Sequence, residues 1–291
     1  MTRLLPLPIL LPLIAAALSI LTGRSRRVQR IIALTTLTAN VAASVAILVA
    51  VDTEGTKAIQ AGGWPAPIGI SLVADRLSAL LLVVATSMLL AVLVYAIGQP
   101  GAERNHVGFQ SVYLLLAAGV SAAFLTGDLF NLFVAIEMML TASYVLITLG
   151  GRLDQVRAGM TYVVISLLAS TLFMATLAYV YAATGTMNMA DLSQKVPELP
   201  VGTRTALAVM MLVVFGIKAA LVPLHFWLPD AYPTAPSPVT AIFAGLLTKV
   251  GIYAIVRTQT LLFDPGDLPL GLLLVVAAVT MVVGVVGAIA Q

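Results

Sequence analysis

The hydrophobic residues of this chain gather in long runs, and the polar residues are confined mostly to short gaps between the runs. A helix needs about 20 mostly apolar residues to cross the hydrocarbon core of a bilayer, and on this criterion the pattern predicts about nine spans. The predicted spans lie at roughly 4–22, 29–51, 75–97, 108–126, 129–149, 157–183, 204–228, 236–258 and 268–290. The expected fold class is therefore all-α, a polytopic bundle of transmembrane helices.

The gaps between the runs carry the Gly, Pro, Asp and Asn residues of turns, and the two longest gaps are roughly 52–74 and 184–203. Lys and Arg accumulate in cytoplasmic loops. Most of them lie in the odd-numbered gaps, at Arg24, Arg26, Arg27, Arg30, Arg104, Arg152 and Arg157. We therefore predict a multi-pass protein of the cell inner (plasma) membrane, with the N-terminus outside and the first loop cytoplasmic.

The composition agrees with a membrane protein and excludes several other classes. Charged residues make up 9% of the chain and hydrophobic residues 60%, whereas a soluble domain carries about a quarter charged residues. Cysteine is absent, which excludes disulfides, Cys-ligated zinc, iron–sulfur clusters and thiol catalysis. The net charge is only +3, and no basic run is interleaved with aromatics. We therefore expect a lipid bilayer around the chain and no nucleic acid as a partner.

The two ends of the chain are both apolar. The first run spans about 19 residues, which is longer than the hydrophobic core of a signal peptide, and an arginine cluster follows it instead of a cleavage site. We interpret it as a retained first span. The last run reaches Gln291 without a polar segment after it, and from this we expect a C-terminally truncated chain.

Three charged residues lie inside predicted spans: Glu137, Lys218 and Lys249. A charge at the centre of a membrane helix costs about 2.5–3.5 kcal/mol on insertion scales, so it needs a partner or a function. A structural ion pair is one explanation and a proton relay is the other. Three groups of both signs, with His225 and a broken helix nearby, favour the relay.

The chemistry of these groups suits proton transfer. Removal from water favours the neutral amine of a lysine, whereas a neighbouring carboxylate favours the ammonium. Glu137 would thus control proton release from Lys218. A histidine titrates near neutral pH, so His225 and Lys249 are the groups expected to carry the proton onward.

Pro223 follows Lys218 within the seventh run. A proline lacks a backbone N–H and clashes with the carbonyl four residues earlier, which here belongs to Ala219. Non-helical backbone at membrane depth is tolerated where it is buried in protein or lines a watery cavity, and transporters place ion sites at such breaks. We predict a discontinuous seventh helix broken at Pro223, with a simple proline kink as the alternative.

Other polar residues give weaker signals. Asp75 opens the third span, Asp128 precedes the fifth and is a candidate helix cap, and Asp230 follows a Trp-Leu-Pro sequence near the break. We keep these three as secondary candidates and expect structural roles for them. The chain has no Walker loop and no dinucleotide-binding turn. We therefore expect no cofactor, no metal site and no catalytic residue, and an energy source in an ion gradient or a partner.

Long motifs in the chain resemble a known family. They are DRLSALLLVV, GDLFNLFVAIEMMLTASYVLI and GIKAALVPLHFWLPDAYPTAPSPVTAIFAGLLTKVGIYAIVRT. They are similar to the antiporter-like membrane subunits, which include the large subunits of Mrp-type multisubunit Na⁺/H⁺ antiporters. Related subunits occur in respiratory complex I and in membrane hydrogenases. The similarity covers nearly the whole chain.

This resemblance implies two inverted repeats of five helices, of which the chain holds the first. The implied organisation is an N-terminal three-span segment at 1–107, the first repeat at 108–262 with its broken helix near 219–230, and the start of a second repeat at 263–291. It also implies a relay in which the glutamate of the fifth span pairs with the lysine of the broken seventh helix, and the lysine of the eighth continues the path. These positions match Glu137, Lys218 and Lys249, with His225 in the connecting segment.

Three functions remain open at this point. The first is a subunit of a secondary antiporter that exchanges Na⁺, or another monovalent cation, for protons together with other antiporter-complex subunits. The second is a proton-translocating subunit of an NADH:quinone oxidoreductase or a membrane hydrogenase, which would place the chain under NADH dehydrogenase activity by family. The third is a structural membrane subunit that transports nothing.

Overall fold

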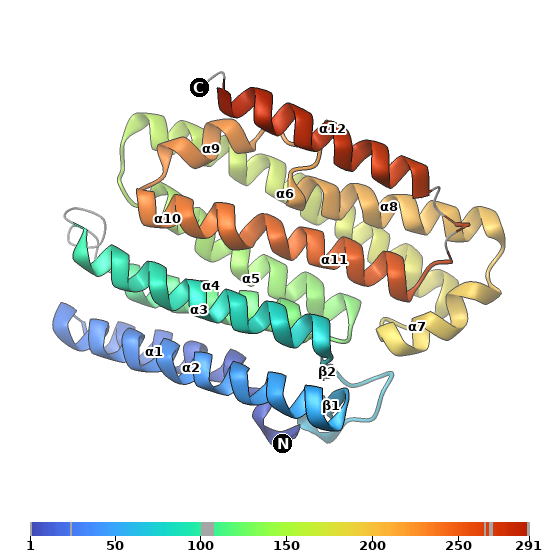
Figure 1. Cartoon of the computed structure of the whole chain (residues 1–291), viewed down its shortest axis with the longest axis horizontal. Helices are drawn as coiled ribbons and strands as arrows, with labels where there is room; N and C mark the ends of the chain where they lie inside the picture. Colours follow the sequence, from blue (N-terminus) through green and yellow to red (C-terminus); the bar gives the residue numbers. More distant parts are fainter. Residues whose placement is uncertain (1, 24, 100–107, 265, 268–269, 290–291) are drawn as a thin grey trace.

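The computed structural model describes residues 2–23, 25–99, 108–264, 266–267 and 270–289. Its helices lie side by side along one long axis (Figure 1). Within these residues, eight helices are long and apolar enough to cross a membrane, and Phe109–Leu125 is a shorter apolar helix. The predicted all-α bundle of transmembrane helices is confirmed.

The long helices are α1 (Leu7–Leu21), α2 (Arg26–Glu54), α3 (Arg76–Gly98), α4 (Phe109–Leu125), α5 (Leu129–Thr148), α6 (Leu153–Thr184), α8 (Val201–Ala219), α11 (Thr248–Leu261) and α12 (Leu270–Ile289). Apart from α8, which ends nine residues before the predicted end at 228, the predicted runs begin and end within a few residues of the helical spans in the structure. The eighth predicted span is built from α10 (Ser237–Ile242), the π-helical turn η4 (Phe243–Leu247) and α11. Short helical elements also occur at η1 (Thr2–Leu4), η2 (Ala61–Gly63), α7 (Met189–Lys195), η3 (Val196–Glu198) and α9 (Leu228–Thr234).

Helix α4 forms the centre of the bundle. All of its side chains except those of Val112 and Leu115 are buried, and it packs against α1, α3 and α5. Small residues allow this close packing, as in other membrane helices. A Cβ atom on Gly119 would lie 2.8 Å from the backbone nitrogen of Met139, so glycine is needed where α4 meets α5. This contact holds α5 against α4 at Met139, which is two residues after Glu137 in the sequence.

The first long connector folds as a β-hairpin, which the hydrophobic pattern did not predict. Strand β1 (Lys57–Gln60) pairs antiparallel with β2 (Ser71–Ala74). The cross-strand pairs are Lys57–Ala74, Ala58–Val73, Ile59–Leu72 and Gln60–Ser71. A further bridge joins Leu72 to Thr126, which ties the hairpin to the loop between α4 and α5.

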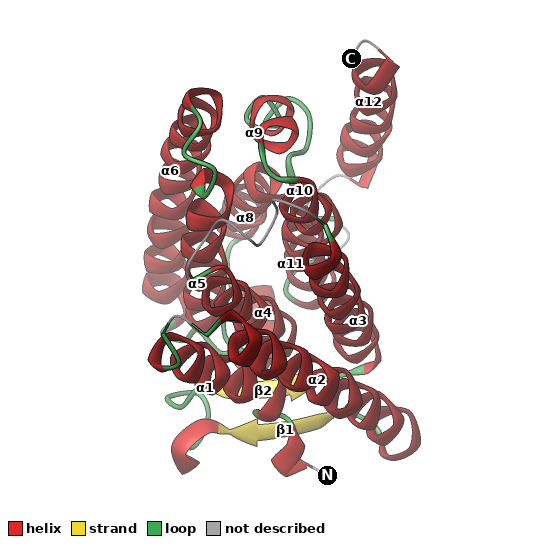
Figure 2. Cartoon of the chain, turned by 90° about the vertical axis from the view of Figure 1, so that its left-hand side faces the viewer, coloured by secondary structure: helices red, strands yellow, loops and turns green. Residues whose placement is uncertain are grey.

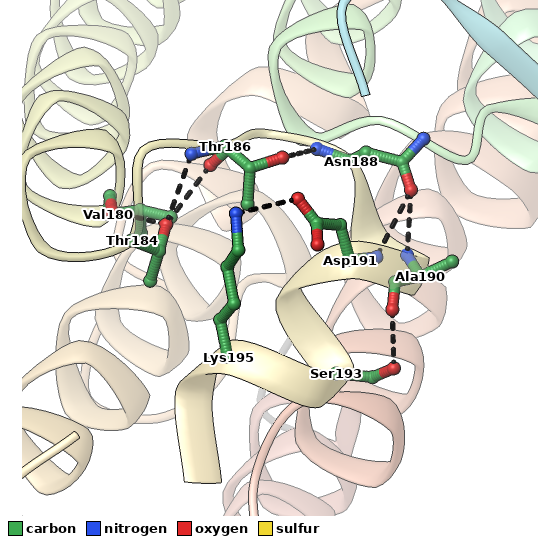
Figure 3. A network of polar contacts seen from close by, with 8 residues as sticks. All are labelled: Val180, Thr184, Thr186, Asn188, Ala190, Asp191, Ser193 and Lys195. Carbon is green, nitrogen blue, oxygen red and sulfur yellow. Dashed lines mark hydrogen bonds and ion pairs between the residues drawn. The ribbon is translucent and has the colours of Figure 1, made fainter. Parts of the chain in front are cut away.

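The second long connector is held by polar contacts around Asn188 (Figure 3). The side-chain oxygen of Asn188 accepts hydrogen bonds from the backbone N–H groups of Ala190 (3.1 Å) and Asp191 (3.3 Å), and so caps α7. The Lys195 ammonium donates to Asp191 at 3.0 Å and is the main cause that lowers the pKa of this carboxyl. The amide nitrogen of Asn188 donates to Ser71 at 3.0 Å, so the connector is also attached to the hairpin.

The seventh span is discontinuous, as the sequence predicted. Helix α8 ends at Ala219, the chain is not helical over 220–227, and α9 begins at Leu228. Helix α12 stands apart from the other helices (Figure 2), and none of its side chains over 271–289 is buried. It is linked to the break by Val222, whose backbone N–H donates to the Thr280 hydroxyl at 3.1 Å.

Candidate functional site

The structure brings Glu137 and Lys218 together in the interior of the bundle. The Lys218 Nζ atom lies 4.0 Å from the Glu137 Oε1 atom, across the space between α8 and α5. The Lys218 side chain is 6% exposed and the Glu137 side chain 28% exposed. Two opposite charges are thus held close together at a depth where water is scarce, and each reduces the cost of burying the other.

Ser170 of α6 lies between these two groups. It is not among the site residues predicted from the sequence. Its hydroxyl donates to Glu137 Oε1 and accepts from Lys218 Nζ, with 3.0 Å between Ser170 Oγ and Lys218 Nζ. Lys218 also donates to the backbone carbonyl of Ser166 at 3.0 Å. Ser166 and Ser170 are spaced i and i+4 on one face of α6. This pair in an apolar helix was the available signal, but serine is common in membrane helices and its partners could not be inferred.

The end of α8 positions Lys218 in the last helical turn. Ala220 adopts a left-handed conformation (φ 55°), and the N–H of Leu221 bonds back to the Gly216 carbonyl at 2.9 Å. This arrangement caps a helix C-terminus, usually with glycine, and alanine there costs about 1–2 kcal/mol. The C-terminal end of the helix dipole favours the Lys218 ammonium.

The helix break lies within the predicted range of 219–230, and it begins before Pro223, the residue to which the sequence pattern attributed it. Helix α8 has already ended at Ala219, and Pro223 lies in the non-helical segment that follows. The turn at Ala220 is therefore what ends the helix. Sequence reasoning missed this turn because alanine, unlike glycine, gives no signal for a left-handed conformation.

Neighbouring residues close the broken end of α8. A Cβ atom on Gly251 would lie 2.6 Å from the Ala219 nitrogen, so a glycine lets α11 pack directly against the end of α8. The indole N–H of Trp227 donates to the Ile217 carbonyl at 3.0 Å, and its ring stacks on Tyr162 with 5.2 Å between ring centroids. Backbone groups freed by the break thus find partners inside the protein, as membrane depth requires.

A cavity of about 10 Å³ lies beside Lys218. This is close to the volume that one water molecule needs. The side chains around it are mostly apolar or aromatic. They include Met139, Tyr162, Ile165, Ile217, Trp227 and Leu247. The interior next to Lys218 therefore has room for about one water molecule. Lys218 is hydrogen-bonded directly to Ser166 and Ser170, and Glu137 lies 4.0 Å away as its ion-pair partner.

His225 and Lys249 lie outside this group of contacts. His225 is half-buried, and within the described residues its Nδ1 atom is buried without a hydrogen-bond partner. Lys249 lies on the outside of the described chain, where its Nζ atom donates to the Ala244 carbonyl at 2.5 Å and to the Thr248 hydroxyl at 3.3 Å. Ala244 belongs to the π-helical turn η4, and such turns are frequent at functional sites.

Asp75 forms a bidentate ion pair with Arg257, which joins the start of α3 to the end of α11. The two contacts are 2.5 Å (Nη1 to Oδ2) and 2.8 Å (Nη2 to Oδ1). The Asp75 side chain also caps α3 by accepting from the Ser78 N–H. Burial alone would raise the pKa of Asp75, but the hydrogen bonds and charge of Arg257, together with Ser78, lower it to about 2. The pair borders a cavity of about 350 Å³ between the hairpin and α7.

Replacing Asp75 with Asn should destabilise the protein by about 1–3 kcal/mol, because Arg257 would be left without its charged acceptor. The folded-state pKa is depressed, so the contribution of Asp75 is complete above its ordinary pKa of 3.8 and is lost as the pH falls through about 2. Thermal unfolding of the purified protein at neutral and acidic pH measures both effects. Equal losses of stability for Asp75→Asn, Arg257→Gln and the double variant would show that the two side chains stabilise the protein through each other. Additive losses would show that the interaction between them contributes nothing.

The other secondary candidates lie at opposite ends of the bundle. Asp128 caps α5 by accepting from the Asn131 N–H at 2.9 Å, and burial raises the pKa of its carboxyl. Asp230 is exposed in the first turn of α9, beside a cavity of about 620 Å³ that Asp154 and Arg157 also line. In the part of the chain that the structure describes, no group of three or more His, Cys, Asp or Glu residues could hold a metal ion.

The chain is similar to a known family and to individual relatives. Residues 126–291 match the family "NADH:quinone oxidoreductase/Mrp antiporter, TM". The D-type subunit of the Na⁺/H⁺ antiporter of Alkalihalophilus pseudofirmus is 46% identical over 294 residues, and that of Bacillus subtilis is 40% identical over 292 residues. Each match covers the whole of this chain and 59% of the relative. The chain thus spans little more than half the length of these relatives.

Two solved structures have the same fold. The Mrp complex from Dietzia sp. DQ12-45-1b matches with a TM-score of 0.93 and 34% identity, over 100% of this chain and 55% of that chain. The membrane-bound sulfane sulfur reductase, an archaeal respiratory membrane complex, matches with a TM-score of 0.83 and 29% identity, over 91% of this chain and 54% of that chain. The resemblance inferred from the sequence motifs is confirmed.

Proposed function

Because the chain belongs to the NADH:quinone oxidoreductase/Mrp antiporter transmembrane family, we propose that it is a membrane subunit of a secondary antiporter that exchanges Na⁺, or another monovalent cation, for protons. The chain is a multi-pass membrane protein. We place it in the inner (plasma) membrane, with the N-terminus outside and the first loop cytoplasmic. Other membrane subunits of the same complex are its partners.

The observation that carries this proposal is the contact group of Glu137, Ser170 and Lys218. Glu137 and Lys218 are titratable groups of opposite charge, 4.0 Å apart inside the bundle. A proton moved from the ammonium to the carboxylate neutralises both groups at once, which lowers the cost of keeping them away from water. Such a pair can store a proton in one state and release it in another.

His225 and Lys249 extend the relay in this proposal. A neutral imidazole has one acceptor nitrogen that can take up a proton, and the Nδ1 atom of His225 is buried without a hydrogen-bond partner among the described residues. Lys249 lies on the span that packs against the end of α8. Neither residue has a hydrogen bond to Glu137 or Lys218 among the described residues, so a proton must cross to them through water or a movement of the helices.

A second candidate function is proton translocation driven by a redox reaction in a larger complex. The name of the family includes NADH:quinone oxidoreductase as well as the Mrp antiporter, and a respiratory complex is among the solved structures with this fold. The two relatives that are D-type subunits of Na⁺/H⁺ antiporters favour the antiporter.

Addition of Na⁺ to inverted membrane vesicles that contain the full protein in its complex should move protons out of an acidified lumen. A pH-sensitive dye reports this movement, and vesicles from cells without the complex give the background. Addition of an oxidisable substrate such as NADH, without a Na⁺ gradient, is the second arm. No response to Na⁺ or other monovalent cations, together with proton uptake on substrate oxidation, would replace the antiporter proposal with the redox-driven one.

A further inference from the structure

The hydroxyl group of Ser170 connects the two charged groups more closely than they contact each other. Glu137 and Lys218 are separated by 4.0 Å, which exceeds the length of a hydrogen bond. Both are hydrogen-bonded to Ser170, which donates to Glu137 Oε1 and accepts from Lys218 Nζ at 3.0 Å. Two hydrogen bonds in series therefore run from the ammonium to the carboxylate.

We propose that Ser170 is the proton-conducting link between Lys218 and Glu137. This inference rests on the proposed function and assigns a role to a third residue of the same site. One Nζ–H bond of Lys218 breaks as an O–H bond forms on Ser170. The original O–H bond of Ser170 breaks as an O–H bond forms on Glu137 Oε1. The ammonium and carboxylate become an amine and a carboxylic acid, the serine is regenerated, and no other reactant is needed.

Ser170 has a second acceptor for its single hydrogen. Its Oγ atom lies 2.9 Å from the backbone carbonyl of Ser166, one turn earlier on α6. A hydroxyl group has one hydrogen and rotates to suit its partners. When the hydrogen points to Glu137, the path from Lys218 is continuous, and when it points to Ser166, the path is interrupted. Rotation of one bond can thus open and close the link without movement of a helix.

The alternative donors and acceptors at this position are limited. The cavity beside Lys218 measures about 10 Å³ and is lined mainly by apolar and aromatic side chains. Among the described residues, the Lys218 ammonium also donates to the Ser166 carbonyl, at 3.0 Å. A peptide carbonyl cannot pass a proton onward, because it has no hydrogen to release. Of the Ser170 hydroxyl and the Ser166 carbonyl, the hydroxyl is therefore the acceptor that can pass the proton from Lys218 onward.

Four variants in the complete complex test the link. Ser170→Ala removes the hydroxyl, Ser170→Thr retains it, and Ser170→Cys replaces it with a larger thiol that is only a weak donor and acceptor. Thr176→Val is the matched control, because Thr176 is a buried residue of α6 whose hydroxyl, among the described residues, bonds to its own helix, at 2.8 Å from the Leu172 carbonyl. Complex assembly is quantified for each variant before transport is compared.

We expect Ser170→Ala and Ser170→Cys to slow cation-dependent proton exchange by about a hundredfold or more, the scale on which a positioned proton donor contributes. Ser170→Thr should restore most of the rate, and Thr176→Val should match the unsubstituted protein. The low rate of Ser170→Ala should persist across the pH range. A role limited to positioning would instead shift the pH optimum, and the rate would recover at another pH.

Two further results overturn the link. One is an unchanged rate for Ser170→Ala or Ser170→Cys while Glu137→Gln is inactive, which leaves the relay and removes Ser170 from it. The other is an assembled Ser170→Thr variant as slow as Ser170→Ala, because the hydroxyl would then not be the decisive group. If Glu137→Gln also keeps the full rate, the whole relay through this pair fails. A complex without substitutions that shows no cation-dependent proton exchange would instead reject the proposed function.

Discussion

Glu137→Gln should abolish cation-driven proton exchange and leave the protein in the membrane. Glutamine keeps the volume of the side chain and can still accept a hydrogen bond from Ser170, but it cannot take up a proton. Lys218 also loses the carboxylate 4.0 Å away. We expect the exchange rate to fall by about a hundredfold or more, since a positioned acid or base typically contributes that much. Dye-reported pH changes in inverted vesicles measure the rate.

The matched control for this variant is Glu198→Gln. Glu198 is an exposed carboxylate in the connector between α7 and α8, so the same chemical change there should leave exchange intact. The abundance of each variant in the membrane and its assembly with other subunits are measured in parallel. An assembled Glu137→Gln variant with normal exchange would show that the carboxylate only pairs with Lys218.

Lys218→Arg should be as inactive as Lys218→Ala, although arginine keeps the positive charge. A guanidinium group cannot be deprotonated in proteins, so it can pair with Glu137 but cannot pass a proton to Ser170. The alanine variant leaves Glu137 without a charged partner, which makes it a test of pairing as well as of proton transfer. We expect a loss of exchange on the same scale of about a hundredfold, measured in the same vesicles.

Lys195→Arg is the control for this substitution. Lys195 forms a surface ion pair with Asp191 at 3.0 Å, and such pairs tolerate exchange between the two cations. Normal exchange by an assembled Lys218→Arg variant would contradict the relay, because a group that holds its proton permanently would then suffice. Loss of assembly in Lys218→Arg but not in Lys218→Ala would indicate a steric effect. The exchange rate of the alanine variant then tests whether Lys218 is needed.

The length and spacing of the apolar runs were enough to predict the helices. A membrane leaves backbone groups without water, so an apolar run of sufficient length has to form a helix. The same reasoning failed for the first long connector, where strands β1 and β2 have four residues each. Strands this short show no clear alternation, and their pairing depends on contacts with the loop between α4 and α5.

The break in the seventh span was predicted, but its mechanism was not. Pro223 indicated that a regular helix could not continue, and the structure has a non-helical segment around it. Helix α8 nevertheless ends at Ala219, because the residue after it, Ala220, adopts a left-handed conformation. The close approach of α11 at Gly251 and the Trp227 hydrogen bond to Ile217 stabilise this end. Contacts between distant segments decided where the helix stops.

The sequence by itself determined the membrane-spanning helices and the presence of Glu137, Lys218 and Lys249 within them, because burying charge in a bilayer is costly enough to stand out in any apolar run. Only the tertiary structure decided which of these groups meet. The rotation of each helix about its axis depends on packing, and packing turns Glu137 and Lys218 toward Ser170 while Lys249 lies on the outside of the described chain. A serine gives no such signal in the sequence, since its importance comes entirely from the two charged groups placed on either side of it.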